Sequence, residues 1–160
     1  MKDIPALIQS LPAFQTLLSE ISEAKEPESL GLSRSARLPF LAALHEASRR
    51  PILLLTQKTD RALTLADELA LWMPEGLRLY FPEPTSLFYE NAAWGENTRR
   101  ERLLALTTLA ASHFPGVPKP DHPPILIAPT RAIMTRTLPR QDFLKATQTI
   151  KPGQVIRPSQ

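Results

Sequence analysis

The sequence contains no cysteine, which excludes a disulfide framework and any metal site built on thiolates. It has three histidines, none at a metal-ligand spacing from another, so we expect no metal site. The amino-terminal stretch MKDIPALIQSLPAF is interrupted by Asp3, Pro5, Gln9 and Pro12, so it is not a signal peptide. No run approaches the roughly 18 apolar residues of a membrane span. These absences predict a cytoplasmic protein.

Acidic residues are scarce in the second half of the chain, so charge is unevenly distributed. Residues 1–90 hold nine Lys and Arg against twelve Asp and Glu, whereas residues 91–160 hold ten against four, so the halves carry −3 and +6. A basic half could face nucleic acid or an acidic partner. The candidate nucleic-acid contacts are Arg99, Arg100, Arg102, Arg131, Arg136 and Arg140. No aromatic residues are interleaved with these arginines as a stacking surface requires, so we favour a solvated basic surface.

Apolar residues recur at helical spacing in several segments. Pro12 divides the first of them into a short helix and a longer one over about 11–24. The next helix ends before Pro51, and its expected apolar face is Phe40, Leu41, Leu44 and Ala47. Further helices are expected over 59–72, around 130–136, and from Thr98, where Thr98 and Glu101 have the spacing of a capping box.

Three short apolar runs between these helices predict strands. They are residues 51–56, 77–81 and 125–129, and the continuous runs 51–56 and 125–129 are typical of strands covered on both faces. Strands that alternate with helices predict an α/β fold with a mostly parallel sheet, flanking helices and right-handed crossovers. We expect amino-terminal helices over 1–27 and one main domain over 28–140. Residues 143–156 alternate in a β-like way, and residues 141–160 are expected to begin a further domain.

One glycine-containing stretch that opens a helix has the position of a phosphate-binding loop, whose pattern is G-x-x-x-x-G-K-[ST]. The stretch is Gly31-Leu32-Ser33-Arg34-Ser35-Ala36-Arg37-Leu38. Ala36 replaces the second glycine, and its Cβ intrudes where backbone must approach phosphate. Arg37 replaces the lysine and Leu38 replaces the hydroxyl residue that holds magnesium. Pro39 further disturbs the first helical turn. We therefore expect no bound nucleotide and no cofactor.

An ATPase of this kind also needs an acid at the end of a buried strand to organise magnesium. The runs ending at Gln57 and Thr130 offer none, and Glu83, between two prolines, is the only candidate. The chain is therefore predicted not to be an enzyme, and the loop to be retained for structure. Weak binding of an anion by Arg34, Arg37 and the helix N-terminus remains an alternative, as does a nucleotide-dependent enzyme.

The order of motifs resembles the N-terminal region of bacterial transcription-repair coupling factors (Mfd). The resemblance covers about residues 28–155 and lies in GLSRSAR at 31–37, the F-P-x-x-x-x-L-x-Y-E pattern at 81–90, E-R-L-x-x-L at 101–106 and the strand ending in A-P-x-x-A at 125–132. It implies a fold like the first domain (1a) of the excision-repair protein UvrB, a degenerate P-loop, RecA-like domain.

The resemblance also implies a role. The parent protein would be an ATP-dependent DNA translocase that releases stalled RNA polymerase at DNA lesions and recruits UvrA. This chain would be a non-catalytic module of it, and the UvrA contact would lie mainly in the domain expected to begin near residue 141. No UvrA-contact residue is therefore assigned.

The loop over 81–97 is shorter than the corresponding UvrB region, which leads into a hairpin that clamps DNA. Its large apolar residues are expected to be core residues or domain-interface anchors rather than base-stacking residues, and we favour the interface. They are Phe81, Leu87, Phe88, Tyr89 and Trp94. The alternative functions are a nucleic-acid-binding α/β domain and a weak nucleotide-binding domain.

Overall fold

The computed structural model of the chain describes residues 3–26, 29–84, 94–111, 114, 117, 121–148, 150 and 153. Its elements, in chain order, are α1 (Asp3–Gln9), α2 (Pro12–Ser22), the 3₁₀ turn η1 (Arg34–Ala36), α3 (Arg37–Ser48), β1 (Ile52–Thr56), α4 (Thr59–Trp72), β2 (Arg78–Tyr80), α5 (Glu96–Ala110), β3 (Ile125–Pro129), α6 (Thr130–Met134) and α7 (Arg140–Ala146). Each of the expected strands is present, and the helix expected over 59–72 has those bounds.

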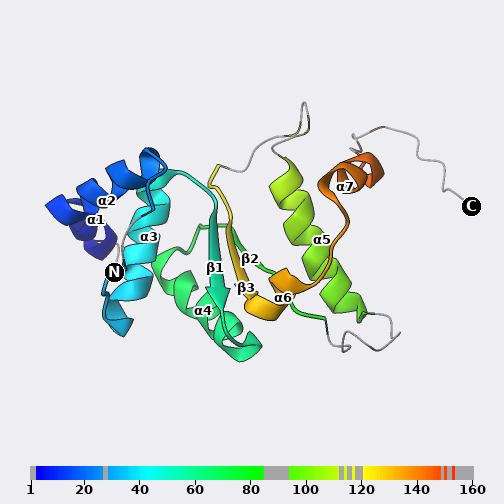
Figure 1. The fold of residues 1–160 in the computed structure, drawn as a ribbon, viewed down its shortest axis with the longest axis horizontal. Helices are drawn as coiled ribbons and strands as arrows, with labels where there is room; N and C mark the ends of the chain where they lie inside the picture. Colours follow the sequence, from blue (N-terminus) through cyan, green and yellow to red (C-terminus); the bar gives the residue numbers. More distant parts are fainter. Residues whose placement is uncertain are drawn as a thin grey trace, which may run out of the picture.

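The described strands form a parallel sheet in the order β1-β3-β2 (Figure 1). The central strand β3 pairs with β1 from Ile52 opposite Ile125, and with β2 from Arg78 opposite the same residue. Every residue of β3 is buried. The α/β fold with a parallel sheet and flanking helices is therefore confirmed.

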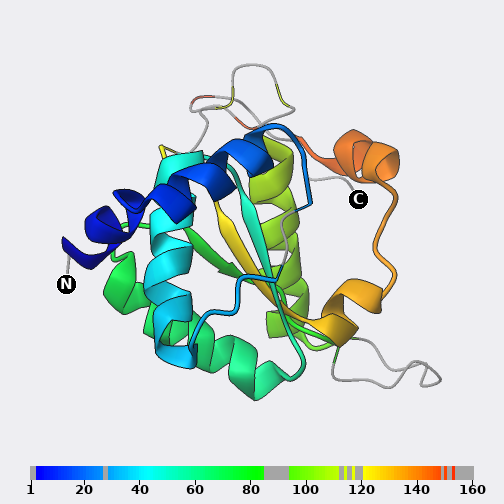
Figure 2. The same ribbon diagram turned by 60° about the vertical axis from the view of Figure 1, so that its left-hand side comes forward.

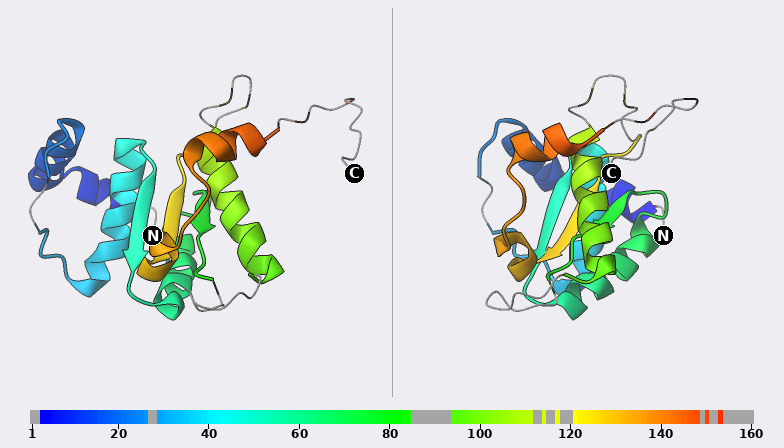
Figure 3. Two further views of the ribbon diagram at one scale, coloured as in Figure 1. Left: turned by 45° about the vertical axis from the view of Figure 1, so that its right-hand side comes forward. Right: turned by 90° about the vertical axis from the view of Figure 1, so that its right-hand side faces the viewer.

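Helices cover both faces of this sheet, because successive side chains of a strand point to opposite sides. On one face, Ile125 and Ile127 of β3 pack with Ala62 and Leu69 of α4. On the other face, Leu126 and Ala128 of β3 pack with α5 and α6 through a second buried cluster. Figures 2 and 3 show α5 on the side of the strands opposite to α3 and α4.

Strand β1 is covered on one face only, so the prediction of a strand covered on both faces is wrong. Leu53 and Leu55 are 49% and 51% exposed. They lie opposite Leu126 and Ala128 in the register, which places them on the α5 face of the sheet. Helix α5 contacts β2, at the other edge of the sheet, and does not extend over β1. The apolar run at 51–56 therefore predicted a strand correctly, but it did not predict that one face of this strand stays uncovered.

The amino-terminal helices pack against α3 (Figure 1). Pro12 stands at the start of α2, as expected, since its missing N–H is not needed there. Phe14 of α2 meets Phe40 of α3 edge-on, with ring centroids 5.5 Å apart, and Gln9 Nε2 donates to the Ala43 carbonyl at 3.2 Å. Helix α3 is thus packed between these helices and the sheet.

Because α3 has neighbours on two sides, its expected apolar face is only partly correct. Phe40, Leu41, Leu44 and Ala47 are half-buried. The buried residues of this helix are Pro39, Ala42, Ala43 and His45. Pro39 does not interrupt the helix, because it lies in the first turn, where backbone N–H groups lack helical partners, and the tighter turn η1 leads into it.

Two further local predictions are wrong. Helix α5 begins at Glu96 with Gly95 as its cap, so Thr98 lies inside the helix and forms no capping box. Residues 143–146, expected to be β-like, belong to α7. Asp142 in the first turn of α7 and Lys145 in its last turn both suit the helix dipole, and this favours a helix over a strand. Among the described residues, no helix is long and apolar enough to cross a membrane.

Candidate functional site

The loop with the position of a phosphate-binding loop lies beside the carboxyl ends of the strands. Gly31 has φ +54°, and a Cβ built there would meet nothing within 4 Å. The glycine therefore serves the left-handed backbone of a turn rather than a close approach of another group. Ser33 and Ser35 lie 3.3 Å apart, hydroxyl to hydroxyl, and both are exposed, as is Arg34.

The last residues of the loop make contacts that stabilise the loop and the core. The Nε of Arg37 donates to the Leu32 carbonyl at 3.4 Å, within the loop itself. Ala36 is half-buried at the start of α3, where no side chain caps the helix. Leu38, at the position of a magnesium-binding hydroxyl, packs against the core cluster of Ile125 and Ile127. In this chain that position serves core packing rather than metal chemistry.

The element that precedes the loop also differs, because a phosphate-binding loop follows a strand. Here the described element before the loop is helix α2, and β1 follows α3. Between the loop, α3 and α4 lies a hollow of about 920 Å³ that is lined largely by leucines. Its charged residues are Arg34, Arg37 and the pair Arg61 and Glu68, which lie 3.5 Å apart.

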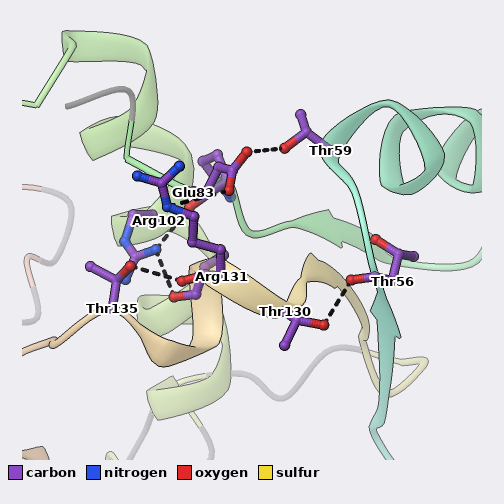
Figure 4. Close-up of polar contacts among 9 residues, drawn as sticks. Thr56, Thr59, Glu83, Arg102, Thr130, Arg131 and Thr135 are labelled. Atoms are coloured by element: carbon purple, nitrogen blue, oxygen red, sulfur yellow. Dashed lines mark hydrogen bonds and ion pairs between the residues drawn. The ribbon is translucent and has the colours of Figure 1, made fainter. Parts of the chain in front are cut away.

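Glu83, the only acid expected near a strand end, is held by neighbouring side chains (Figure 4). The hydroxyl of Thr59 donates to one carboxylate oxygen at 2.6 Å, and Arg131 Nε lies 3.9 Å from the other. Thr59 begins α4 and Arg131 lies in α6, so the carboxylate joins two helices at the carboxyl edge of the sheet. Nearby, the Thr130 hydroxyl donates to the Thr56 carbonyl at 3.0 Å and joins α6 to β1.

The phenol of Tyr80, at the end of β2, is part of the same edge. Burial raises the pKa of Tyr80 above its ordinary value because the charged form loses hydration, although a hydrogen bond with Thr59 acts in the opposite direction. Among the described residues, no three His, Cys, Asp or Glu side chains come together as metal ligands.

Arg102 is buried, with 2% of its surface exposed, so it is removed from the candidate nucleic-acid contacts. Its Nη1 donates to the carbonyls of Pro82 and Ala132 at 2.8 and 3.2 Å (Figure 4). Its guanidinium lies 4.0 Å from the Phe81 ring centroid and 4.8 Å from that of Trp94. Nε and Nη2 are buried without a hydrogen-bond partner. Burial lowers the pKa of Arg102, because desolvation disfavours the charged form.

The expected interface anchors divide into three groups. Phe81 is buried in the core with 4% exposure, so of the two alternatives it follows core packing and not the favoured domain interface. Trp94 is half-buried against Arg102. Leu87, Phe88 and Tyr89 lie outside the described residues.

Of the other arginines, Arg99, Arg136 and Arg140 lie along α5 and the segment that leads into α7, whereas Arg100 and Arg131 do not line the hollows there. Arg99, Arg100, Arg131, Arg136 and Arg140 are exposed. Arg99 and Arg136 line one hollow beside α5. Arg131 faces Glu83 instead.

Sequence reasoning missed this hollow, which also contains Leu103, Leu138 and Phe143. The sequence did contain a signal for it, because α5 carries more leucines than one buried face can hold. They are Leu103, Leu104, Leu106 and Leu109.

No protein-family profile matches the chain, and no solved structure matches it. The transcription-repair-coupling factor of Bacillus subtilis (strain 168) is 29% identical to it over 162 residues. The chain is distantly related to this coupling factor. The match covers 100% of the chain, so it includes residues 1–27, to which the sequence motifs did not extend. The chain spans 13% of the length of that relative.

Proposed function

We propose that the chain is a non-catalytic N-terminal module of a transcription-repair coupling factor. The observation that carries this proposal is the similarity to the Bacillus subtilis coupling factor along the whole chain. The parent protein would release stalled RNA polymerase at DNA lesions and recruit UvrA in the cytoplasm of a bacterium. Residues 28–140 would be its degenerate UvrB-like domain, and residues 141–160 would lead into the UvrA-binding domain.

The contacts of two loop residues and of Glu83 support the non-catalytic part of this proposal. Leu38 fills core space where a magnesium-binding hydroxyl would stand, and Arg37 bonds to its own loop. Glu83 is held by Thr59 and Arg131 and so is not free to organise an ion. A module of this kind would contribute surfaces for its parent chain and partners, while ATP chemistry would belong to a motor elsewhere in the parent.

Titration with a fluorescent ATP analogue and magnesium tests the non-catalytic part. We expect no saturable binding by the chain, because the loop lacks the groups that hold phosphate and metal. The matched variant is Ala36→Gly, Arg37→Lys, Leu38→Thr, and its circular dichroism spectrum must first show that loss of the Leu38 packing leaves it folded. Magnesium-dependent, micromolar binding by the unchanged chain would contradict the proposal.

A chimera tests the biological role. In the Bacillus subtilis coupling factor, the region that matches this chain is either replaced by the chain or deleted. We expect the replacement to support preferential repair of the transcribed strand, and the deletion to support less. A chimera that repairs no better than the deletion would contradict the assignment to this protein class.

A further inference from the structure

A groove runs along α5, between this helix and the segment that leads into α7. Its first part has a volume of about 570 Å³ and an apolar lining that includes Leu103, Leu106, Leu138 and Phe143. A second part of about 300 Å³ shares three of these residues and continues to Ala110, near the end of α5. From Arg99 to Ala110 the helix rises about 16 Å, which is the length of a three-turn helix or a short extended peptide.

The apolar side chains of this groove are incompletely covered. Leu103 is 53% exposed and Leu138 is 61% exposed, although they stand on different segments and line the same hollow. Exposed apolar groups on two walls of one groove are typical of a surface that receives the apolar side of a partner segment.

The charges around the first part of the groove have one sign. Arg99 and Arg136 are exposed at its rim, and no Asp or Glu is among the described residues that line either part. Arg102 lines the inner end, and its Nε and Nη2 are buried with no hydrogen-bond partner. Its buried charge adds to that of the two exposed arginines, so the lining as a whole favours an anionic partner.

We propose that this groove binds an acidic, amphipathic segment of a partner protein. Bulky apolar side chains of the segment fill the space beside Leu103, Leu138 and Phe143. Its carboxylates pair with the exposed Arg99 and Arg136. The inference uses residues outside the loop at 31–38 and does not depend on the proposed function.

Selection of binders from a library of random peptides tests which kind of segment occupies the groove. The peptides have about twelve residues, which is the length that the groove accommodates. The immobilised probe is the whole chain, and the selected peptides are then synthesised and measured by fluorescence anisotropy. We expect a consensus with Asp or Glu beside bulky apolar residues at positions i and i+3 or i+4. Selection that yields no binder, or binders without acidic residues, would overturn the proposal.

Adjacent arginines provide a matched pair of variants. Arg99 lines the groove, whereas its neighbour Arg100 is exposed and lines neither part. We expect Arg99→Glu to weaken peptide binding about tenfold or more, and Arg100→Glu to change it less than about threefold. Leu138→Asp, at an exposed position in a loop, is expected to weaken binding as strongly without unfolding the chain. Equal effects of Arg99→Glu and Arg100→Glu would show non-specific attraction and overturn the proposal.

Competition experiments distinguish a peptide-binding groove from a site for nucleic acid or for a free anion. A short oligothymidylate and inorganic phosphate are added separately to the complex of chain and peptide. We expect neither to displace the peptide at moderate salt, because the apolar contacts are made only by the peptide. Displacement by oligothymidylate would make the groove a nucleic-acid site, and displacement by phosphate would make it an anion site. Either result would overturn the proposal.

Discussion

Replacement of Arg102 measures how much a buried guanidinium without an ionic partner stabilises this fold. Its Nη1 joins α5 to the segment after β2 and to α6, through the carbonyls of Pro82 and Ala132. A hydrogen bond from a charged donor contributes about 1.5–3 kcal/mol. Stacking on Phe81 and Trp94 adds about 0.5–2 kcal/mol for each ring. The opposing cost is the desolvation of the cation, which amounts to several kcal/mol.

These terms predict an order of stability among three variants. Arg102→Lys retains a charged donor but loses the planar stacking surface, and we expect it to lower the free energy of unfolding by about 1 kcal/mol. Arg102→Met removes the desolvation cost but leaves two buried carbonyls without a donor, for a net loss of about 2 kcal/mol. Arg102→Ala adds a cavity between the rings, and the expected loss is about 4 kcal/mol.

Urea unfolding, followed by tryptophan fluorescence and by circular dichroism, measures these differences, provided that the slope against urea stays constant. Arg100→Met is the matched control, because Arg100 is the exposed neighbour on the same helix, and its effect should stay within about 0.5 kcal/mol. An Arg102→Met variant as stable as the original chain would refute the reasoning. It would show that desolvation cancels both hydrogen bonds and both ring contacts.

Three further substitutions are expected to act locally. Gly31→Ala should lower the free energy of unfolding by about 1 kcal/mol, since φ is positive there and the space for a Cβ is free, and urea unfolding checks this. His45→Leu should cost about 1–3 kcal/mol in the same assay, because the buried ring nitrogen Nε2 lies 2.6 Å from the Pro123 carbonyl, which would lose its donor. We expect the half-exposed Leu53 and Leu55 of edge strand β1 to drive self-association of the chain. Leu53→Thr and Leu55→Thr together should therefore reduce it in sedimentation velocity with little change in stability; a chain that does not self-associate, or undiminished self-association, would contradict this.

The sequence was sufficient for the order of elements as far as α6, because strong local signals mark their ends. Pro12 starts α2, and Pro74 and Gly76 follow the end of α4. The apolar run 125–129 is a strand buried along its whole length, as such a run predicts. These signals act within a few residues, so they do not depend on which elements become neighbours.

The sequence did not allow us to predict in the same way which helices and strands surround each strand. The run at 51–56 is as apolar as that at 125–129, but β1 is an edge strand and β3 is central. Which strand becomes central depends on the two crossovers, through α4 and through α5, and no local pattern encodes them. The candidate loop shows the same limit: the loss of its phosphate-binding groups was visible in the sequence, whereas the packing of Leu38 on the sheet was not.

Helix α5 also shows that the sequence did not predict which side of a helix faces the sheet and which remains exposed. Its buried residues include Thr98, Arg102 and Ala105, which recur at helical spacing and face Phe81 and the sheet. Of its leucines, Leu106 and Leu109 pack at the border of the buried cluster, whereas Leu103 and Leu104 are 53% and 58% exposed. Small residues let the helix approach the sheet closely, and Arg102 fits there because its stem is apolar and its head finds carbonyls and rings. Leu103 and Leu106 line the groove beside α7, so the orientation of α5 that buries an arginine also leaves apolar surface for a partner.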